Sequence, residues 1–259
     1  MPEESGVSPA VLLLHGATHL GRKSGLIVLL GHYFQQAGWI VLAPDARGFG
    51  DSVDPADIDS PDSWNPEHDI RRCIDYLYSL LSTDKDLVFV IGHSMGAGHA
   101  LEFANKDPRI KAMVLICPPS HINGIQDSFW QRIKFSAVRG LNDPIASNVY
   151  LVRSRKADIQ TYLDGFLSRT HLPVLLVGGE REGMLNRDYL SRIAENVSQP
   201  FEYLTLKKLG HYCGVYNHPF TGTVYYRPDA FQPFFAFLMD YLNARNPAVQ
   251  AKVSKTYQP

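Results

Sequence analysis

Five consecutive residues could perform nucleophilic chemistry: Gly92-His93-Ser94-Met95-Gly96. They follow the apolar run Leu87-Val88-Phe89-Val90-Ile91, which predicts a buried strand, and they precede a helix-like segment, Met95 to Asn105. A strand, Gly-x-Ser-x-Gly and a helix in this order are typical of a nucleophile elbow, a sharp turn that exposes a serine hydroxyl above a sheet. Only glycine is expected to fit at positions 92 and 96 of such a turn. Ser94 is therefore the candidate nucleophile.

A serine hydroxyl needs a base, usually a histidine, and in this type of sheet the order along the chain is serine, acid, histidine. His211 is the candidate base, because it follows the predicted strand Phe201–Leu206 through a short turn. Ligand sites gather at the carboxyl ends of strands in open α/β sheets. His218 is the alternative base. His93 is expected to point away from the nucleophile beside it.

The acid is expected in the turn after the predicted strand Val174–Val177, where the sequence is Gly178-Gly179-Glu180-Arg181-Glu182-Gly183. We choose Glu182. Glu180 and then Asp188 are the alternatives. They rank below Glu182 because each could instead cap the helix that follows or pair with a neighbouring arginine.

An oxyanion hole needs two backbone N–H groups directed at the developing negative charge. One is expected from Met95, directly after the nucleophile, and the other from Ala17, in the loop that follows the strand ending at Leu14. Gly16 would let that loop turn, and His15 is interpreted as a structural residue without a catalytic role. The residues expected to contact the substrate are Thr18, His19 and Tyr212.

The elements that must position these residues alternate between strand-like and helix-like segments, which predicts a mostly parallel sheet of about six strands covered by helices. The expected strands are Ala10–Leu14, Trp39–Ala43, Leu87–Ile91, Ala112–Ile116, Val174–Val177 and Phe201–Leu206. The expected helices are Ser24–Ala37, Pro66–Leu81, Met95–Asn105, Arg187–Glu195 and Phe231–Asn243. The second helix has Pro at its start and apolar Ile70, Ile74, Leu77 and Leu81 at helical spacing.

Residues 118–172 interrupt this alternation. The segment is too long for a simple connection, so we expect a helical lid inserted before the penultimate strand. The predicted organisation is a core of residues 1–117 and 173–246, the lid, and a frayed tail of residues 247–259.

Composition excludes several classes of function. The formal net charge is −1 with no run of Lys and Arg, so neither a nucleic-acid partner nor an anionic membrane is indicated. Three scattered cysteines fit neither a disulfide framework nor a zinc site, and no metal is expected. The acidic, polar start is unlike a signal peptide, and no apolar run approaches the ~20 residues of a membrane helix. These features favour a soluble, cytoplasmic protein; the sequence does not indicate its oligomeric state.

The ordered motifs of the chain resemble those of the α/β-hydrolase superfamily, in particular its branch with a serine nucleophile and a helical lid. The resemblance rests on His15-Gly16, Pro44-Asp45-x-Arg47-Gly48-x-Gly50-Asp51-Ser52, the elbow, Gly179-x-x-Glu182 and Gly210-His211. It implies that Asp45 and Arg47 belong to a structural loop bordering the site. It also matches Glu182 to the family's acid position, where aspartate is commoner.

Two departures from the family pattern are visible. About ten residues precede the first strand, so the usual opening pair of strands is expected to be absent and the sheet reduced. After His211, the aromatic-rich segment Tyr212 to Pro228 delays the last helix. Its rings could form a wall beside the catalytic histidine or pack against the C-terminal helix.

The resemblance implies two-step acyl transfer on a small-molecule carboxylic ester or thioester, without a cofactor. Serine at the elbow argues against epoxide hydrolases and haloalkane dehalogenases, relatives that use a carboxylate nucleophile. The absence of a His-Gly-Gly-Gly run makes the chain unlike the hormone-sensitive-lipase branch. Serine aminopeptidases and carbon–carbon bond hydrolases use the same residues. A non-catalytic ligand-binding or interaction protein on this fold is the alternative of another class.

Overall fold

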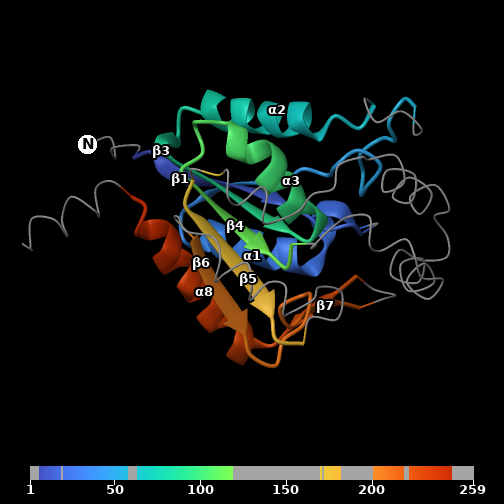
Figure 1. Ribbon diagram of the computed structural model, residues 1–259, viewed down its shortest axis with the longest axis vertical. Coiled ribbons are helices and arrows are strands. Elements are labelled where there is room, and N and C mark those ends of the chain that lie inside the picture. The colour runs from blue at the N-terminus through green and yellow to red at the C-terminus, as the bar shows by residue number, and fades with distance from the viewer. Residues whose placement is uncertain are drawn as a thin grey trace, which may run out of the picture.

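The computed structural model describes residues 6–18, 20–57, 63–118, 170, 172–181, 201–218 and 222–246. Within these ranges one six-stranded sheet has the order β2-β1-β3-β4-β5-β6, and every neighbouring pair is parallel (Figure 1). The strands are β1 Ser8–Leu14, β2 Ile40–Leu42, β3 Thr83–His93, β4 Ala112–Ile116, β5 Val174–Gly179 and β6 Phe201–Leu206. The predicted parallel α/β sheet is confirmed. The expected lid lies outside the described residues except at its ends, and so does the expected C-terminal tail.

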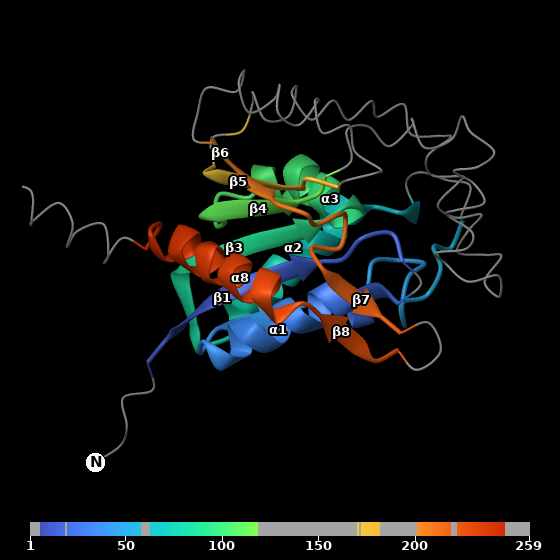
Figure 2. The same ribbon diagram turned by 90° about the horizontal axis from the view of Figure 1, so that it is seen from below.

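Helices cover both faces of the sheet. In Figures 1 and 2, α2 (Pro66–Ser79) and α3 (Met95–Phe103) lie on one face, whereas α1 (Gly25–Gln36) and α8 (Pro228–Asn243) lie on the other. These four confirm predicted helices with their ends displaced by a few residues, and the expected helix Arg187–Glu195 lies outside the described residues. No helix in the described part of the chain has both the length and the hydrophobicity to cross a membrane.

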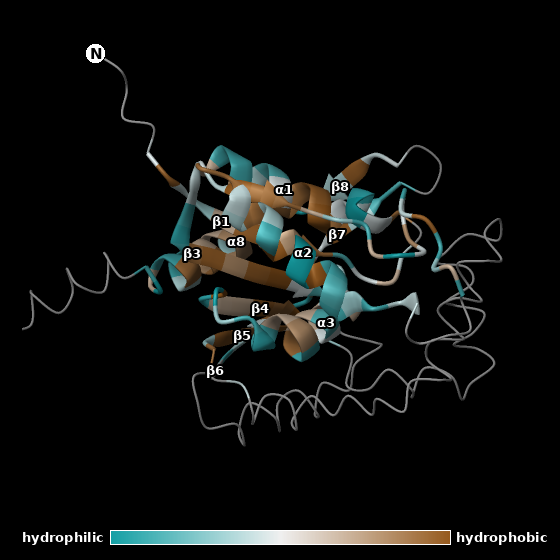
Figure 3. Cartoon of the chain, turned by 90° about the horizontal axis from the view of Figure 1, so that it is seen from above, coloured by the Kyte–Doolittle hydropathy of each residue, from teal (hydrophilic) through white to brown (hydrophobic). Residues whose placement is uncertain are grey.

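Burial on both faces explains why the central strands are continuous apolar runs. Every residue of β4 and β5 is buried. Figure 3 shows hydrophobic residues along β3 and hydrophilic residues on the outer surface of α2. The side chain of Asn65 caps α2 by accepting the N–H of His68 at 3.1 Å, and Pro66 occupies the first turn.

The apolar stripe of α2 is shorter than predicted. Ile70, Ile74 and Leu77 are buried as expected. The prediction for Leu81 was wrong, because the helix ends at Ser79 and the Leu81 side chain is 96% exposed.

The strand order reverses at β1. The chain passes from β1 to the edge strand β2 and then crosses back to form β3 on the other side of β1. In the register of this pair Leu14 of β1 lies opposite Gly92 of β3, so both strands end at the same level. Loops that leave a parallel sheet at such a reversal diverge and leave a crevice, which is where ligands bind in open α/β sheets.

A hairpin that the sequence did not predict follows His211. Strands β7 (Val215–Asn217) and β8 (Val224–Tyr226) are antiparallel, and the Asn217 side chain accepts the N–H of Gly25 at 2.6 Å, which fastens the hairpin to α1. The Tyr226 ring packs on Phe231 of α8, with ring centroids 5.8 Å apart. The cross-strand pair Tyr216 and Tyr225 is exposed. Part of this aromatic segment therefore packs on the C-terminal helix, as one of the two alternatives stated.

Candidate active site

Ser94 occupies a strained turn between β3 and α3. Its φ of 51° and ψ of −116° are rarely adopted by a residue with a side chain. A Cβ at Gly92 would lie 2.3 Å from the carbonyl oxygen of Gly96, and a Cβ at Gly96 would lie 2.3 Å from the carbonyl oxygen of Leu14. The prediction that only glycine fits at positions 92 and 96 is confirmed. The N–H of Ser94 donates to the Ile116 carbonyl at 2.9 Å, which ties the elbow to β4.

The loop after β1 is in contact with this elbow. A Cβ at Gly16 would lie 3.1 Å from the Cβ of Ser94. The two amides expected to form an oxyanion hole therefore belong to two segments that meet beside Ser94. For the N–H groups of Ala17 and Met95, no acceptor is found among the described residues. Met95 begins α3, whose N-terminus adds a partial positive charge.

His15 is buried and holds the loop after β1 from within. Its Nε2 accepts the N–H of Ala46 at 2.9 Å, and its Nδ1 is 2.7 Å from the Gly16 carbonyl. Since a carbonyl oxygen can only accept, the ring is the tautomer with hydrogen on Nδ1. Both ring nitrogens serve loop structure, in agreement with the structural role predicted for His15.

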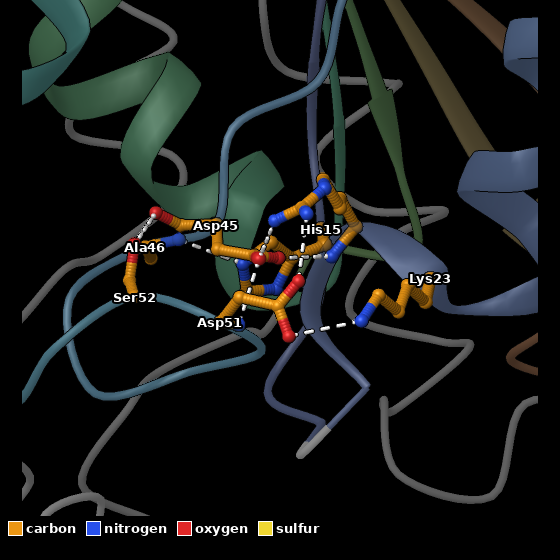
Figure 4. A network of polar contacts seen from close by, with 7 residues as sticks. His15, Lys23, Asp45, Ala46, Asp51 and Ser52 are labelled. Carbon is orange, nitrogen blue, oxygen red and sulfur yellow. Dashed lines mark hydrogen bonds and ion pairs between the residues drawn. The ribbon is translucent and has the colours of Figure 1, made fainter.

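Asp45 joins the loop after β1 to the loop after β2, as Figure 4 shows. Its side chain is 1% exposed, accepts the N–H of Arg22 at 2.6 Å and the N–H of Asp51 at 2.9 Å, and forms an ion pair with the Arg22 guanidinium. Its own carbonyl accepts the hydroxyl of Ser52 at 2.8 Å. A buried carboxylate with this many donors fixes the two loops relative to each other.

Arg47 holds the start of α2 against the same loop. Its guanidinium makes a bidentate pair with Asp69, with both N–O distances 2.7 Å, and donates to the Ser63 carbonyl at 3.0 Å. The structure thus places Asp45 and Arg47 in scaffold contacts.

A cavity of about 50 Å³ lies between this loop, α2 and α3. Met95 and Cys73 are on its wall. Ligand sites usually measure ~300–1,000 Å³, so this cavity has room for a few water molecules and is smaller than a typical substrate pocket.

His211 lies at the same edge of the sheet as Ser94, beyond the turn that follows β6. The turns after β5 and β6 are joined by two contacts: the Glu180 carboxylate accepts the N–H of Lys208 at 2.7 Å, and the N–H of Arg181 donates to the Leu209 carbonyl at 2.7 Å. The ring of His211 contacts that of Tyr212 at 5.2 Å, edge to face.

Two buried thiols, those of Cys117 and Cys213, lie near His211. The thiol of Cys117, directly after β4, is buried and lies close to the side chains of Cys213 and His211. The contact with Cys213, together with burial, raises the pKa of the Cys117 thiol well above its usual value, and the contact with His211 acts in the opposite direction.

The sequence profile described as "alpha/beta hydrolase fold" matches residues 9–142. The chain belongs to the α/β hydrolase family. Epoxide hydrolase 3 of Siraitia grosvenorii is 37% identical over 110 residues, which make up 42% of this chain and 32% of that protein. The chain thus spans about a third of the length of the curated relatives that it matches.

Solved structures share the fold across most of this α/β hydrolase. DcsB, in complex with its substrate analogue, has a TM-score of 0.68 at 19% identity, covering 93% of this chain and 92% of DcsB. The Pyrococcus furiosus esterase Pf2001 has a TM-score of 0.67 at 17% identity, covering 93% of this chain and 83% of the esterase. At these identities the likeness shows the fold alone.

Five of the predicted site residues of this α/β hydrolase lie at the same edge of the sheet. Ser94, Ala17, His211 and Tyr212 lie on turns or loops there, and Met95 is the first residue of α3. The Thr18 hydroxyl accepts the N–H of Leu20 at 3.3 Å, which braces the loop.

Other predicted residues are placed elsewhere or not described. His218, the alternative base, lies at the end of β7 with its ring 6.1 Å from that of Tyr225. The residues outside the described ranges are His19, Glu182 and Asp188. In the described part of the chain, no group of three His, Cys, Asp or Glu side chains could hold a metal ion.

Sequence reasoning missed the neighbours of His211. Cys117 could have been found from its position at the carboxyl end of a predicted strand. The partner of His93 had no such signal, because that contact joins residues 118 positions apart.

Proposed function

We propose that this α/β hydrolase cleaves a carboxylic ester or thioester through an acyl-enzyme intermediate. The observation that carries the proposal is the strained backbone of Ser94 in contact with the loop after β1. Strained turns of this kind persist where surrounding contacts impose them, and they cluster at catalytic sites. Family membership and the position of His211 at the same sheet edge support the proposal.

In the proposed reaction, His211 removes the hydroxyl proton of Ser94 while the oxygen attacks the substrate carbonyl. The amides of Ala17 and Met95 stabilise the oxyanion, and His211 then gives the proton to the departing alcohol or thiol. Water, deprotonated by His211, attacks the acyl-serine ester and releases the acid with return of the proton to Ser94. Glu182 is proposed to orient His211 throughout.

Epoxide hydrolysis is a second candidate, because the matched curated relative at 37% identity is named an epoxide hydrolase. The chemistry of Ser94 favours acyl transfer. A carboxylate that opens an epoxide forms an ester, which water can cleave, whereas a serine oxygen would form an ether without a carbonyl for water to attack. An epoxide opened by Ser94 would therefore leave the enzyme alkylated after one turnover.

A fluorophosphonate probe tests the nucleophile. We expect stoichiometric labelling of the peptide that contains Ser94, and no labelling of Ser94→Ala under the same conditions. Absence of labelling in the wild-type protein would exclude the serine-hydrolase proposal and favour a non-catalytic role.

A substrate panel then assigns the leaving group. Acyl esters of increasing chain length, matched thioesters, aminoacyl amides and an aryl epoxide are compared by kcat/KM. Turnover of esters or thioesters above amides is expected; a preference for aminoacyl amides would indicate an aminopeptidase. Catalytic turnover of the epoxide that survives in Ser94→Ala would contradict the proposal.

A further inference from the structure

His93 connects the elbow directly to the backbone of His211. Its Nε2 lies 2.9 Å from the carbonyl oxygen of His211, and the two rings are 4.8 Å apart. His93 is the last residue of β3 and the sequence neighbour of Ser94. One hydrogen bond therefore joins His93, the residue beside the candidate nucleophile, to the backbone of His211, the candidate base.

The direction of this hydrogen bond follows from chemistry. A carbonyl oxygen can only accept, so Nε2 of His93 carries the hydrogen and donates it. The carbonyls on either side of this one are bonded within the turn: that of Gly210 accepts the N–H of Cys213 at 3.0 Å, and that of Tyr212 accepts the N–H of Val215 at 2.9 Å. The His211 carbonyl instead accepts from a different segment of the fold.

The His93 ring has little freedom to move. Its residue is 3% exposed, its ring centroid is 5.5 Å from that of Tyr212, and a Cβ at Gly16 would lie 2.9 Å from its Nδ1. The ring is therefore packed between the loop after β1 and the turn that carries His211. A donor held on both sides can set the position of the group that accepts from it.

We propose that His93 is a positioning residue that holds the His211 loop at the distance from Ser94 that proton transfer requires. The inference rests on the proposed function, because it gives His93 a role through His211. Proton transfer needs heavy atoms at hydrogen-bond distance, so a loop displaced by a fraction of an ångström slows chemistry more than it weakens binding.

Three variants test whether activity depends on the N–H donor of residue 93 and on how far that donor lies from the backbone. His93→Leu fills a similar volume without a donor, and we expect kcat to fall about 10- to 100-fold with KM changed by less than about twofold. His93→Gln keeps an amide N–H at nearly the reach of Nε2 and should recover most of kcat. His93→Asn, with the same amide on a shorter side chain, is the matched control and should remain as slow as the leucine variant.

A second measurement requires no turnover. Amide hydrogen exchange in the peptide spanning residues 209–215 should be faster in His93→Leu and His93→Asn than in the wild type, and unchanged in His93→Gln. Equal exchange in all four proteins would overturn the inference whether or not the enzyme is active. So would a wild-type kcat in His93→Leu, or a His93→Gln variant as slow as the leucine variant. Failure of the proposed function has a different signature: no labelling of Ser94 and no ester turnover in the wild type.

Discussion

Gly16 and Ser94 are in contact at the point where β1 and β3 end, since a Cβ added to Gly16 would lie 3.1 Å from the Cβ of Ser94. The loop proposed to stabilise the oxyanion therefore approaches the nucleophile with no side chain between them. This closeness depends on the level ends of the two strands, where Leu14 pairs with Gly92, and on the polar contacts that hold the loop from behind.

Gly16→Ala should fold but lose activity. Its Cβ would lie 2.9 Å from Nδ1 of His93 as well as against Ser94, so the loop must move away from the elbow. We expect kcat for a reactive ester to fall about tenfold, because a small displacement of an oxyanion donor weakens transition-state stabilisation. Thermal unfolding with a midpoint near that of the wild type should accompany the loss. An unchanged kcat would show that the Gly16 loop does not take part in catalysis.

Gly96→Ala should destabilise the protein itself. Its Cβ would lie 2.3 Å from the Leu14 carbonyl oxygen, and a backbone atom cannot yield as a flexible side chain can. We expect the free energy of unfolding to fall by about 3 kcal/mol, the upper range for overpacking. Gly31→Ala in α1 is the matched control, since its nearest neighbours are 3.8 Å away. That variant should be unchanged or more stable by up to ~1 kcal/mol in denaturant titration.

Asp45→Asn should loosen the two loops that border the site. The amide nitrogen would face N–H donors that the carboxylate accepts, namely the Asp51 amide and the Arg22 guanidinium. We expect a loss of about 2 kcal/mol in unfolding free energy, because these donors lose their acceptor. The loss is no larger than this because Arg22 is half-exposed, so water can solvate its guanidinium. The control is Asp51→Asn, whose side chain is 54% exposed and whose replacement should cost clearly less stability than that of Asp45. Equal effects of the two substitutions would contradict the role of Asp45.

The acid of the triad can be assigned by paired substitutions. The Glu180 carboxylate accepts the backbone N–H of Lys208, an acceptor role that a glutamine oxygen can also fill. Glu180→Gln should therefore retain near wild-type ester turnover, whereas Glu182→Gln should lower kcat at least about 100-fold if Glu182 orients His211. The reverse pattern would move the acid to Glu180, and retention in both would favour Asp188.

Cys73 should react slowly with alkylating reagents at neutral pH. Burial, with a smaller contribution from Asp69, raises the pKa of its thiol to about 11. Because the thiolate is the reactive form, the rate of modification by iodoacetamide should rise about tenfold per pH unit from pH 7 until it levels near that pKa. Cys117 and Cys213 are buried and should react later, on unfolding. Mass spectrometry measures the rate at which Cys73 is labelled. Rapid labelling at pH 7 would show that the environment of Cys73 is more polar than this burial implies.

Much of the fold and the turn that carries Ser94 follow from the sequence, because they depend on residues that are close together in the chain. Apolar runs such as Val174–Val177 report a strand buried on both faces, and helical spacing reports α2 through Ile70, Ile74 and Leu77. The elbow is equally local, since Gly92, Ser94 and Gly96 lie within one turn. The error at Leu81 arose because apolar spacing does not show where a helix ends.

The tertiary structure sets the contacts between segments that are far apart in the chain. The crossing back over β1 brings Gly16 against Ser94, and the turn after β6 brings the His211 carbonyl to the ring of His93. The sequence determined that a strained serine turn would exist and that a histidine would follow the last parallel strand. It could not determine which side chains meet there, because strand order and loop closure are set by the packing of the whole sheet and not by any local pattern of residues.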